Sequence, residues 1–259
     1  IYTGTSGWVV STVDKRMTDI GGLIASILGA IPGWYNYIAE QETAGRCLQW
    51  VRDHLALDEI GVYLENVPYS DKVEQHTSLY EFLNQEVEQV PPGSSGVIFT
   101  PWLHGNRSPF EDPYARGMFF NIGLETGKRD LVRAVLEGVA YHQRWMLERV
   151  ERQVPRQDTL RFVGGGAQSE AWSQILADVT GRKIEVVENA QNAGTVGAAI
   201  VCGVGLGILN SFQEAKPLIR VSQSFIPRAQ HADVYQRSFE VYKDLYKNNR
   251  QMFRRMNRG

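Results

Sequence analysis

The sequence has few of the features that mark specialised protein classes. Only two cysteines, Cys47 and Cys202, occur in 259 residues, too few for a disulfide framework, and neither belongs to a C-x-x-C pair. A reducing compartment is therefore expected, and the cytoplasm fits best. No secretory signal opens the sequence. The longest apolar stretch, Thr195–Leu209, is interrupted by glycines and is too short to span a bilayer, so a membrane protein is not predicted.

An excess of charge of either sign is also missing. The chain has 27 Lys and Arg against 29 Asp and Glu, a formal net charge of −2, so no basic surplus can neutralise the phosphates of DNA or RNA. The hydrophobic fraction of 43% is that of a folded globular protein and excludes intrinsic disorder. Because no internal repeat, low-complexity tract or linker interrupts the sequence, we expect residues 1–259 to form one domain.

Several motifs of well-understood chemistry are absent or incomplete. The segment Gly123–Lys128 has the wrong spacing for a P-loop, and Arg129 stands where Ser or Thr would hold magnesium. The five histidines are scattered without metal-ligand spacing, so no metal site is predicted. No Gly-x-Ser-x-Gly elbow indicates a serine hydrolase, and no pair of carboxylates stands out as a general acid and base.

The order of periodic segments predicts an α/β fold with a mixed sheet. Alternation and β-branched residues predict strands at residues 1–13 (a hairpin), 23–31, 97–100, 118–122, 160–163 and 184–187. Apolar residues three and four apart predict helices at 44–55, 79–87, 129–150, 172–179, 194–207 and 231–252.

Glycine is the one residue in surplus, with 25 of 259 positions, and two of its clusters suit a ligand. Gly164–Ser169 joins a predicted strand to a helix, where free N–H groups and the helix dipole favour an anion or a polar ligand. It is no dinucleotide fingerprint, because G-x-G-x-x-G needs Gly or Ala where Ser169 stands. Gly4–Gly7 offers two hydroxyls and backbone donors that can hold a terminal phosphate. From spacing alone, a structural turn explains the first cluster equally well and the second one better.

Four segments, taken in order, resemble one family. Gly164–Gly181 resembles the adenosine-side signature of the FGGY carbohydrate kinases, and Phe99–Gly117 resembles their long central loop. Leu131–Ala140 is similar to the helix after that loop, and Gly4–Gly7 to their phosphate hairpin. Order and spacing agree over nearly the whole chain, and xylulokinases are the members that it resembles most.

The resemblance implies an actin-like ATPase, ribonuclease-H-like domain in which helices flank a mixed sheet. It corresponds to the C-terminal, nucleotide-side domain of these kinases, which bind ATP, with Mg²⁺, and a sugar between two domains. By this resemblance, we expect the N-terminal sugar-binding domain to be absent from this chain. Since Ile1 is not Met and Ile1–Thr3 already has strand character, we expect residues upstream. By the resemblance the catalytic Asp lies there, so no catalytic residue and no metal ligand is expected in this chain.

The resemblance also implies a set of nucleotide-binding residues. Two lie in the hairpin and face the terminal phosphates, three let adenosine approach the backbone, and two open the following helix. One more, Gly123, is included although the turn around it departs from the family's pattern. The set is Thr5, Ser6, Gly123, Gly165, Gly166, Ala167, Ser169 and Glu170. Three small residues, Gly194, Gly197 and Ala198, are expected to pack closely under the site.

The expected function is therefore that of the ATP-binding half of a carbohydrate kinase, which transfers the γ-phosphate of ATP to a sugar hydroxyl. Similarity suggests D-xylulose, while glycerol, ribulose and gluconate stay open. The expected partners are ATP, the sugar and the missing N-terminal domain, with a homodimer left open. A nucleotide-binding module without catalysis is the alternative. A Rossmann dehydrogenase ranks lower, because no convincing acidic ribose reader follows Gly164–Ser169 by about 20 residues.

Overall fold

Two sheets form the core of the protein. The computed structural model describes residues 1–55 and 85–258. The first sheet is antiparallel, with the strand order β1-β2-β5-β4-β3, and the second has the order β10-β9-β8. The strands of the first sheet are β1 (Tyr2–Thr3), β2 (Gly7–Val13), β3 (Thr18–Asp19), β4 (Ile24–Leu28) and β5 (Tyr35–Gln41). Those of the second are β8 (Thr159–Phe162), β9 (Lys183–Val187) and β10 (Val221–Phe225).

Strand β1 joins the two sheets. Tyr2 forms a parallel bridge with Val163, just after β8. The Thr3 N–H donates to the Val163 carbonyl at 3.0 Å, and the Val163 N–H donates to the Ile1 carbonyl at 3.0 Å. Since β8 also pairs in parallel with β9, the carboxyl ends of β1, β8 and β9 point to the same end of the sheet. The mixed sheet predicted from the sequence is therefore confirmed.

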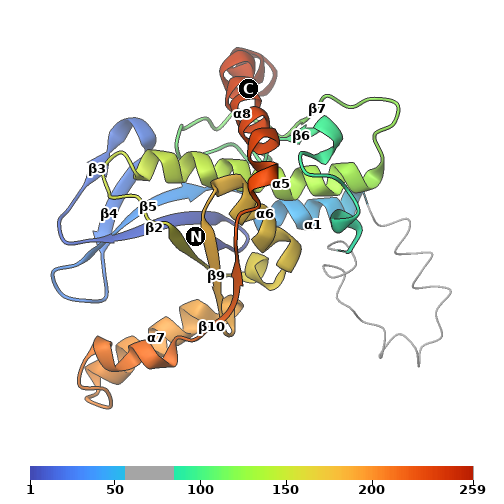
Figure 1. The fold of residues 1–259 in the computed structure, drawn as a ribbon. Coiled ribbons are helices and arrows are strands. Elements are labelled where there is room, and N and C mark those ends of the chain that lie inside the picture. Colours follow the sequence, from blue (N-terminus) through green and yellow to red (C-terminus); the bar gives the residue numbers. More distant parts are fainter. Residues whose placement is uncertain (56–84, 259) are drawn as a thin grey trace.

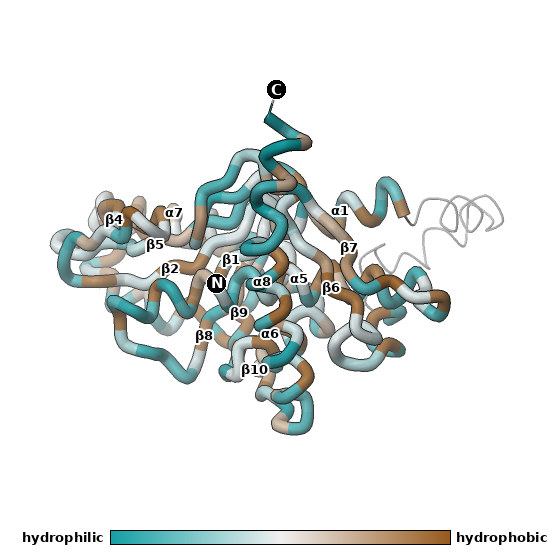
Figure 2. Tube along the Cα trace, turned by 90° about the horizontal axis from the view of Figure 1, so that it is seen from above, coloured by the Kyte–Doolittle hydropathy of each residue, from teal (hydrophilic) through white to brown (hydrophobic). Residues whose placement is uncertain are grey.

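The described part of the chain contains five named α-helices, of which α7 extends away from the sheets (Figure 1). They are α1 (Gly45–His54), α5 (Lys128–Val150), α6 (Glu170–Thr180), α7 (Ala193–Gly205) and α8 (Ala232–Asn257). Alternation along β2 and β5 buries Val9, Tyr37 and Ala39 against Met146 and Leu147 of α5. In Figure 2 the tube of α8 becomes largely hydrophilic toward the C-terminus, and its buried residues end at Leu245.

A long loop between β6 (Ile98–Phe99) and β7 (Phe119–Phe120) is held by aromatic side chains. The Trp102 ring lies 5.6 Å from those of Phe110 and Tyr242, and Phe110 stacks on Tyr246 at 3.5 Å. Beneath the loop, His142 of α5 is fully buried and donates from Nε2 to the Ser108 carbonyl at 2.7 Å. The loop is thereby attached to both α5 and α8.

Most predicted elements are present, with shifted ends, but three strands were missed: the two-residue β3, β5 and β10. Strand β5 follows Pro32–Gly33, where the sequence-based prediction passed directly to a helix. Strand β10 is an exposed edge strand whose residues Val221–Phe225 carry no clear alternation of burial. The helix predicted over residues 79–87 lies largely outside the described residues.

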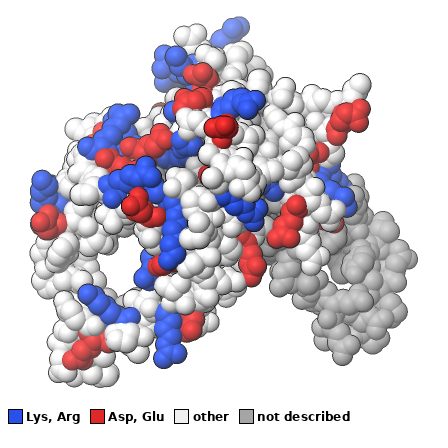
Figure 3. Space-filling model, in the orientation of Figure 1, with Lys and Arg blue, Asp and Glu red and all other residues white. Residues whose placement is uncertain are grey.

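In the ranges 1–55 and 85–258 no helix combines the length and the apolar character that crossing a bilayer requires. On the face shown in Figure 3, cationic and anionic side chains are interspersed rather than gathered by sign. That face accordingly offers no broad basic patch for a polyanion.

We expect the protein to lose stability between about pH 6.5 and pH 4 because of His142. Burial lowers the pKa of His142 from 6.5 to about 4. Over this range the unfolded chain binds a proton that the native protein excludes, so stability falls as the pH falls, by about 3 kcal/mol once pH 4 is reached. Urea unfolding at a series of pH values should show a shallower loss for His142→Gln. Identical pH profiles for the two proteins would contradict the assignment.

Candidate functional site

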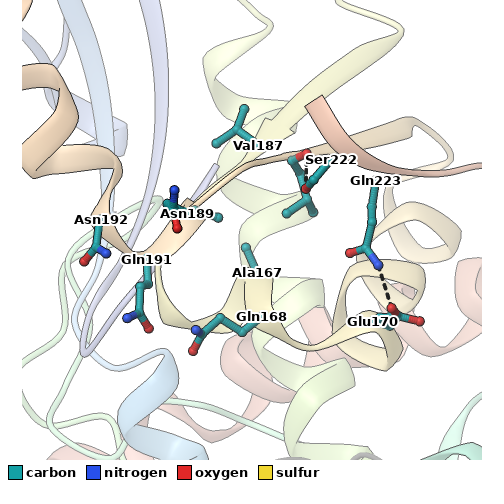
Figure 4. A pocket seen from close by; sticks show the side chains of 11 residues that line it. Ala167, Gln168, Glu170, Val187, Asn189, Gln191, Asn192, Ser222 and Gln223 are labelled. Carbon is teal, nitrogen blue, oxygen red and sulfur yellow. Dashed lines mark hydrogen bonds between the residues drawn. The ribbon is translucent and has the colours of Figure 1, made fainter. Parts of the chain in front are cut away.

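A cavity of about 340 Å³ opens at the carboxyl ends of β8 and β9. That is where open α/β sheets commonly bind ligands, and the volume suits a small molecule. Its walls come from the turn after β8, the turn after β9 and the edge strand β10 (Figure 4). The lining residues are Ala167, Gln168, Glu170, Val186, Val187, Asn189, Ala190, Gln191, Asn192, Ser222 and Gln223.

The cavity is polar but nearly uncharged. Five of its side chains are carboxamides, each offering both a donor and an acceptor: Gln168, Asn189, Gln191, Asn192 and Gln223. The single ionisable lining residue is Glu170, whose carboxylate accepts a hydrogen bond from Gln223 Nε2 at 2.5 Å. No Lys or Arg lines the cavity. This chemistry suits a neutral group with several donors and acceptors, such as a nucleobase or a ribose, better than a phosphate.

The glycine turn after β8 is tied to both neighbouring structures. Gly164 has φ +95°, and its N–H donates to the Ala190 carbonyl at 2.8 Å, which joins the turns after β8 and β9. Gly165 is exposed, and the space where its Cβ would stand is open. Gly166 is buried, and a Cβ there would lie 2.8 Å from Thr3 Cγ2. Close packing against β1 thus explains glycine at 166. Gly165 has open space at its Cβ but is not among the residues that line the cavity, which this turn reaches through Ala167 and Gln168.

Helix α6 begins at the cavity with a side-chain cap. Ser169 is the N-cap residue, and its Oγ accepts a hydrogen bond from the Trp172 N–H at 3.0 Å. A hydroxyl in this position satisfies one of the free N–H groups of the first turn. Glu170 follows in that turn, where a negative charge is favoured by the helix dipole. Ser169 therefore defines the start of α6, and the Glu170 side chain reaches the cavity.

The predicted phosphate hairpin lies next to this turn but outside the cavity. The N-terminus of α1 holds it from behind, because the Ala44 N–H donates to the Thr5 carbonyl at 3.0 Å and the Gly45 N–H to the Gly4 carbonyl at 2.8 Å. The Thr5 residue is exposed and Ser6 half-buried. The backbone of this hairpin is thus fixed, while the Thr5 side chain faces solvent.

Gly123 does not join the other predicted site residues. It lies in the exposed loop between β7 and α5 and is not among the residues that line the cavity. Its N–H donates to Thr126 Oγ1 at 2.9 Å. Local turn geometry therefore accounts for this glycine.

The expectation that Gly194, Gly197 and Ala198 pack closely under the site is wrong. All three are exposed, and a Cβ on either glycine would meet nothing within 4 Å. The physical reason is that α7 leaves the body of the domain after the cavity rim (Figure 1), so that Gly203 is its one buried residue.

Sequence reasoning missed most of the cavity wall. Asn189, Gln191, Asn192, Ser222 and Gln223 were not singled out, because polar residues in turns and edge strands carry no periodic signal. One usable signal was the segment Asn189–Asn192, which directly follows a predicted strand at the edge where α/β sheets bind ligands. Within residues 1–55 and 85–258, no three His, Cys, Asp or Glu side chains come together as a metal site.

We expect Gly166→Ala to destabilise the protein and Gly165→Ala to leave its stability nearly unchanged. A methyl group at 166 would overlap the Thr3 side chain, and such overpacking typically costs about 1–3 kcal/mol. At 165 the space is open. Thermal melting of the two variants makes the comparison, and equal melting temperatures would refute the packing role of Gly166.

Comparison with known proteins places this geometry in a family. Residues 1–206 match the C-terminal domain of the FGGY family of carbohydrate kinases. The xylulose kinase of Staphylococcus epidermidis is 27% identical over 250 residues, which are 96% of this chain and 46% of that protein. The gluconokinase of Bacillus subtilis is 28% identical over 253 residues, 95% of this chain and 46% of that protein. The chain thus spans about half the length of these relatives.

Solved structures share the fold. Xylulose kinase from Lactobacillus acidophilus superimposes with a TM-score of 0.78 at 22% identity, over 96% of this chain and 46% of that one. Plasmodium falciparum glycerol kinase, solved with ADP, gives a TM-score of 0.70 at 19% identity, over 95% of this chain and 46% of that one. The protein belongs to the FGGY carbohydrate kinases, whose C-terminal domain it represents.

Proposed function

We propose that this chain is the nucleotide-binding half of an ATP-dependent sugar kinase that transfers the γ-phosphate of ATP to a sugar hydroxyl. One observation carries the proposal. The carboxyl ends of three parallel strands bring the hairpin with Thr5 and Ser6 beside a carboxamide-lined cavity. The hairpin is suited to phosphates and the cavity to a nucleoside, and the two are adjacent.

In this proposal the cavity receives the nucleoside. Carboxamides can donate and accept at once, and Asn and Gln side chains match the donor and acceptor edge of adenine. The apolar residues Ala167, Val186 and Val187 line the same cavity and can contact the faces of a base. Gly165 lies in the same turn as the lining residues Ala167 and Gln168, and the space beside it is open, so a ligand extending beyond the cavity could approach its backbone.

The phosphates would extend from the cavity toward the hairpin. There the hydroxyls of Thr5 and Ser6 and the turn N–H groups can donate hydrogen bonds without any lysine. Phosphoryl transfer depends mainly on positioning and on stabilising charge, so donors placed in advance are the main contribution of such a half-site. Mg²⁺ accompanies ATP in this chemistry, but the described residues offer no clustered ligands for it. We therefore assign no Mg²⁺ ligand to this chain.

The general base and the sugar pocket would belong to a further part of the protein. The relatives are about twice as long, and the matching family domain is the C-terminal one. Helix α7 supports this division, because residues 189–213 contain no charged side chain, yet most of the helix is exposed and Gly203 is its one buried residue. A helix that is apolar on all sides is normally buried.

For the sugar we propose D-xylulose first and gluconate second, since relatives named xylulose kinase and gluconokinase match with similar identity. The cytoplasm remains the proposed location, because Cys47 and Cys202 are both free thiols and reducing compartments keep them so. The competing proposal is a nucleotide-binding module without catalysis.

Calorimetric titration tests the nucleotide site. We expect the 259-residue chain to bind adenosine and ADP and to show no sugar-dependent release of ADP from ATP. Gly165→Val should weaken binding of both ligands while the melting temperature stays nearly unchanged, because a Cβ at this position would meet no atom within 4 Å. Unaltered adenosine affinity in a folded Gly165→Val protein would remove the case for this cavity.

Activity assays with the longer protein separate a kinase from a non-catalytic module. We expect Val201→Glu, in the exposed α7, to leave the melting temperature of the 259-residue chain unchanged but to lower kinase activity of the longer protein by tenfold or more, about 1.4 kcal/mol. Val10→Glu on the exposed face of β2 provides a charge-matched comparison outside α7. Full activity of the longer Val201→Glu protein would argue against α7 as a contact between the two halves.

A further inference from the structure

We propose that Thr3 and Gln143 form a positioning pair that sets the hairpin turn and the glycine turn of the site relative to each other. Both side chains are fully buried, and neither is among the residues that line the cavity. The inference rests on the proposed nucleotide binding for its functional consequence, while the geometry of the pair stands independently of any ligand.

Thr3 contacts both turns at once. It is the last residue of β1, directly before the hairpin turn, and its N–H donates to the Val163 carbonyl at 3.0 Å. Its methyl group fills the space over Gly166, where a Cβ would lie 2.8 Å from Thr3 Cγ2. Its carbonyl oxygen would lie 2.5 Å from a Cβ on Gly164. A displacement of Thr3 would therefore move the base of the hairpin and disturb the packing of the glycine turn together.

Gln143 of α5 forms a hydrogen bond with Thr3. From α5 its Nε2 donates to Thr3 Oγ1 at 2.5 Å. Thr3 and Gly7 are partners in register at the base of the hairpin, and a Cβ on Gly7 would lie 3.4 Å from the same Nε2. Gln143 thus lies under the residue pair that closes the hairpin. The hydrogen bond directs the Thr3 hydroxyl toward α5, which leaves its methyl toward Gly166, and β-branched side chains have few alternative rotamers.

Stability alone does not explain why a polar glutamine occupies position 143. Gln143 Oε1 is buried without a hydrogen-bond partner among the described residues, and so is the neighbouring Gln41 Oε1. Unpaired buried acceptors are unfavourable, and an apolar side chain at 143 would avoid one of them. A residue that supports a binding turn through a hydrogen bond offers a reason for glutamine that packing alone does not.

Three variants test the pair against a matched control. Thr3→Val keeps a methyl group over Gly166 and removes the acceptor, Gln143→Leu removes the donor, and Thr3→Ser keeps the hydrogen bond. The control is Thr100→Val, which also removes an acceptor hydroxyl from a fully buried threonine, since Thr100 Oγ1 accepts from the Met118 N–H at 3.0 Å. Calorimetry with adenosine and with ADP, together with thermal melting, is carried out on the 259-residue chain.

Adenosine lacks the phosphates that ADP carries. A displaced hairpin should therefore weaken ADP binding more than adenosine binding. We expect Thr3→Val and Gln143→Leu each to weaken ADP about tenfold relative to adenosine, whereas Thr3→Ser and Thr100→Val keep the wild-type ratio of the two affinities. A lower melting temperature of Thr3→Val with an unchanged ratio would overturn the proposal, because Thr3 would then be a packing residue only.

Amide hydrogen exchange gives a readout without nucleotide. The Gly4 N–H donates to the Ser6 carbonyl at 3.0 Å within the hairpin, and the Gly181 N–H donates to the Ala177 carbonyl at 2.9 Å at the far end of α6. In Thr3→Val we expect exchange at Gly4 to accelerate about tenfold or more beyond that at Gly181. If the wild-type chain binds neither adenosine nor ADP, the proposed nucleotide site is wrong. The exchange at Gly4 then tests the positioning role of Thr3 and Gln143 by itself. Equal exchange in wild type and Thr3→Val would overturn it.

Discussion

The parallel pairing between β1 and the residue after β8 is the interaction on which the rest of the structure depends. Two backbone hydrogen bonds, Thr3 to Val163 and Val163 to Ile1, join an antiparallel sheet to a mixed one. They place the hairpin that follows Thr3 beside the glycine turn that follows Val163. Because the bonds are made by backbone groups, they set the position of the site without using any of its side chains.

The site that results relies on dipoles rather than on fixed charge. The cavity is lined by carboxamides, and Glu170 is its one ionisable side chain. The hairpin next to it carries hydroxyls and backbone N–H groups. A chain with a net charge of −2 can therefore present a surface suited to a nucleotide, because oriented amides act as partial positive charges. The carboxamides keep the ligand's donors and acceptors paired once water is displaced.

Helix α7 differs from the other helices of the domain in how little of it is buried. Helices α5 and α6 bury their apolar sides in the core, whereas α7 has no charged residue and buries only Gly203. The fold of the FGGY C-terminal domain is thus present and well packed around the cavity. The relatives that it matches are about twice as long as this chain.

The sequence alone determined the elements whose signals are local. The spacing of apolar residues predicts α5, strand residues around Gly4–Gly7 predict the β1–β2 hairpin, and ordered motifs indicate the family. Only the tertiary structure decided that Gly166 is a packing residue under Thr3, that α7 stands apart, and that Asn189 and Gln223 share a cavity wall. It also revealed β5 and β10. The reason is physical: strand pairing brings together residues far apart in the chain, such as Thr3 and Val163, through backbone bonds that any residue except proline can make.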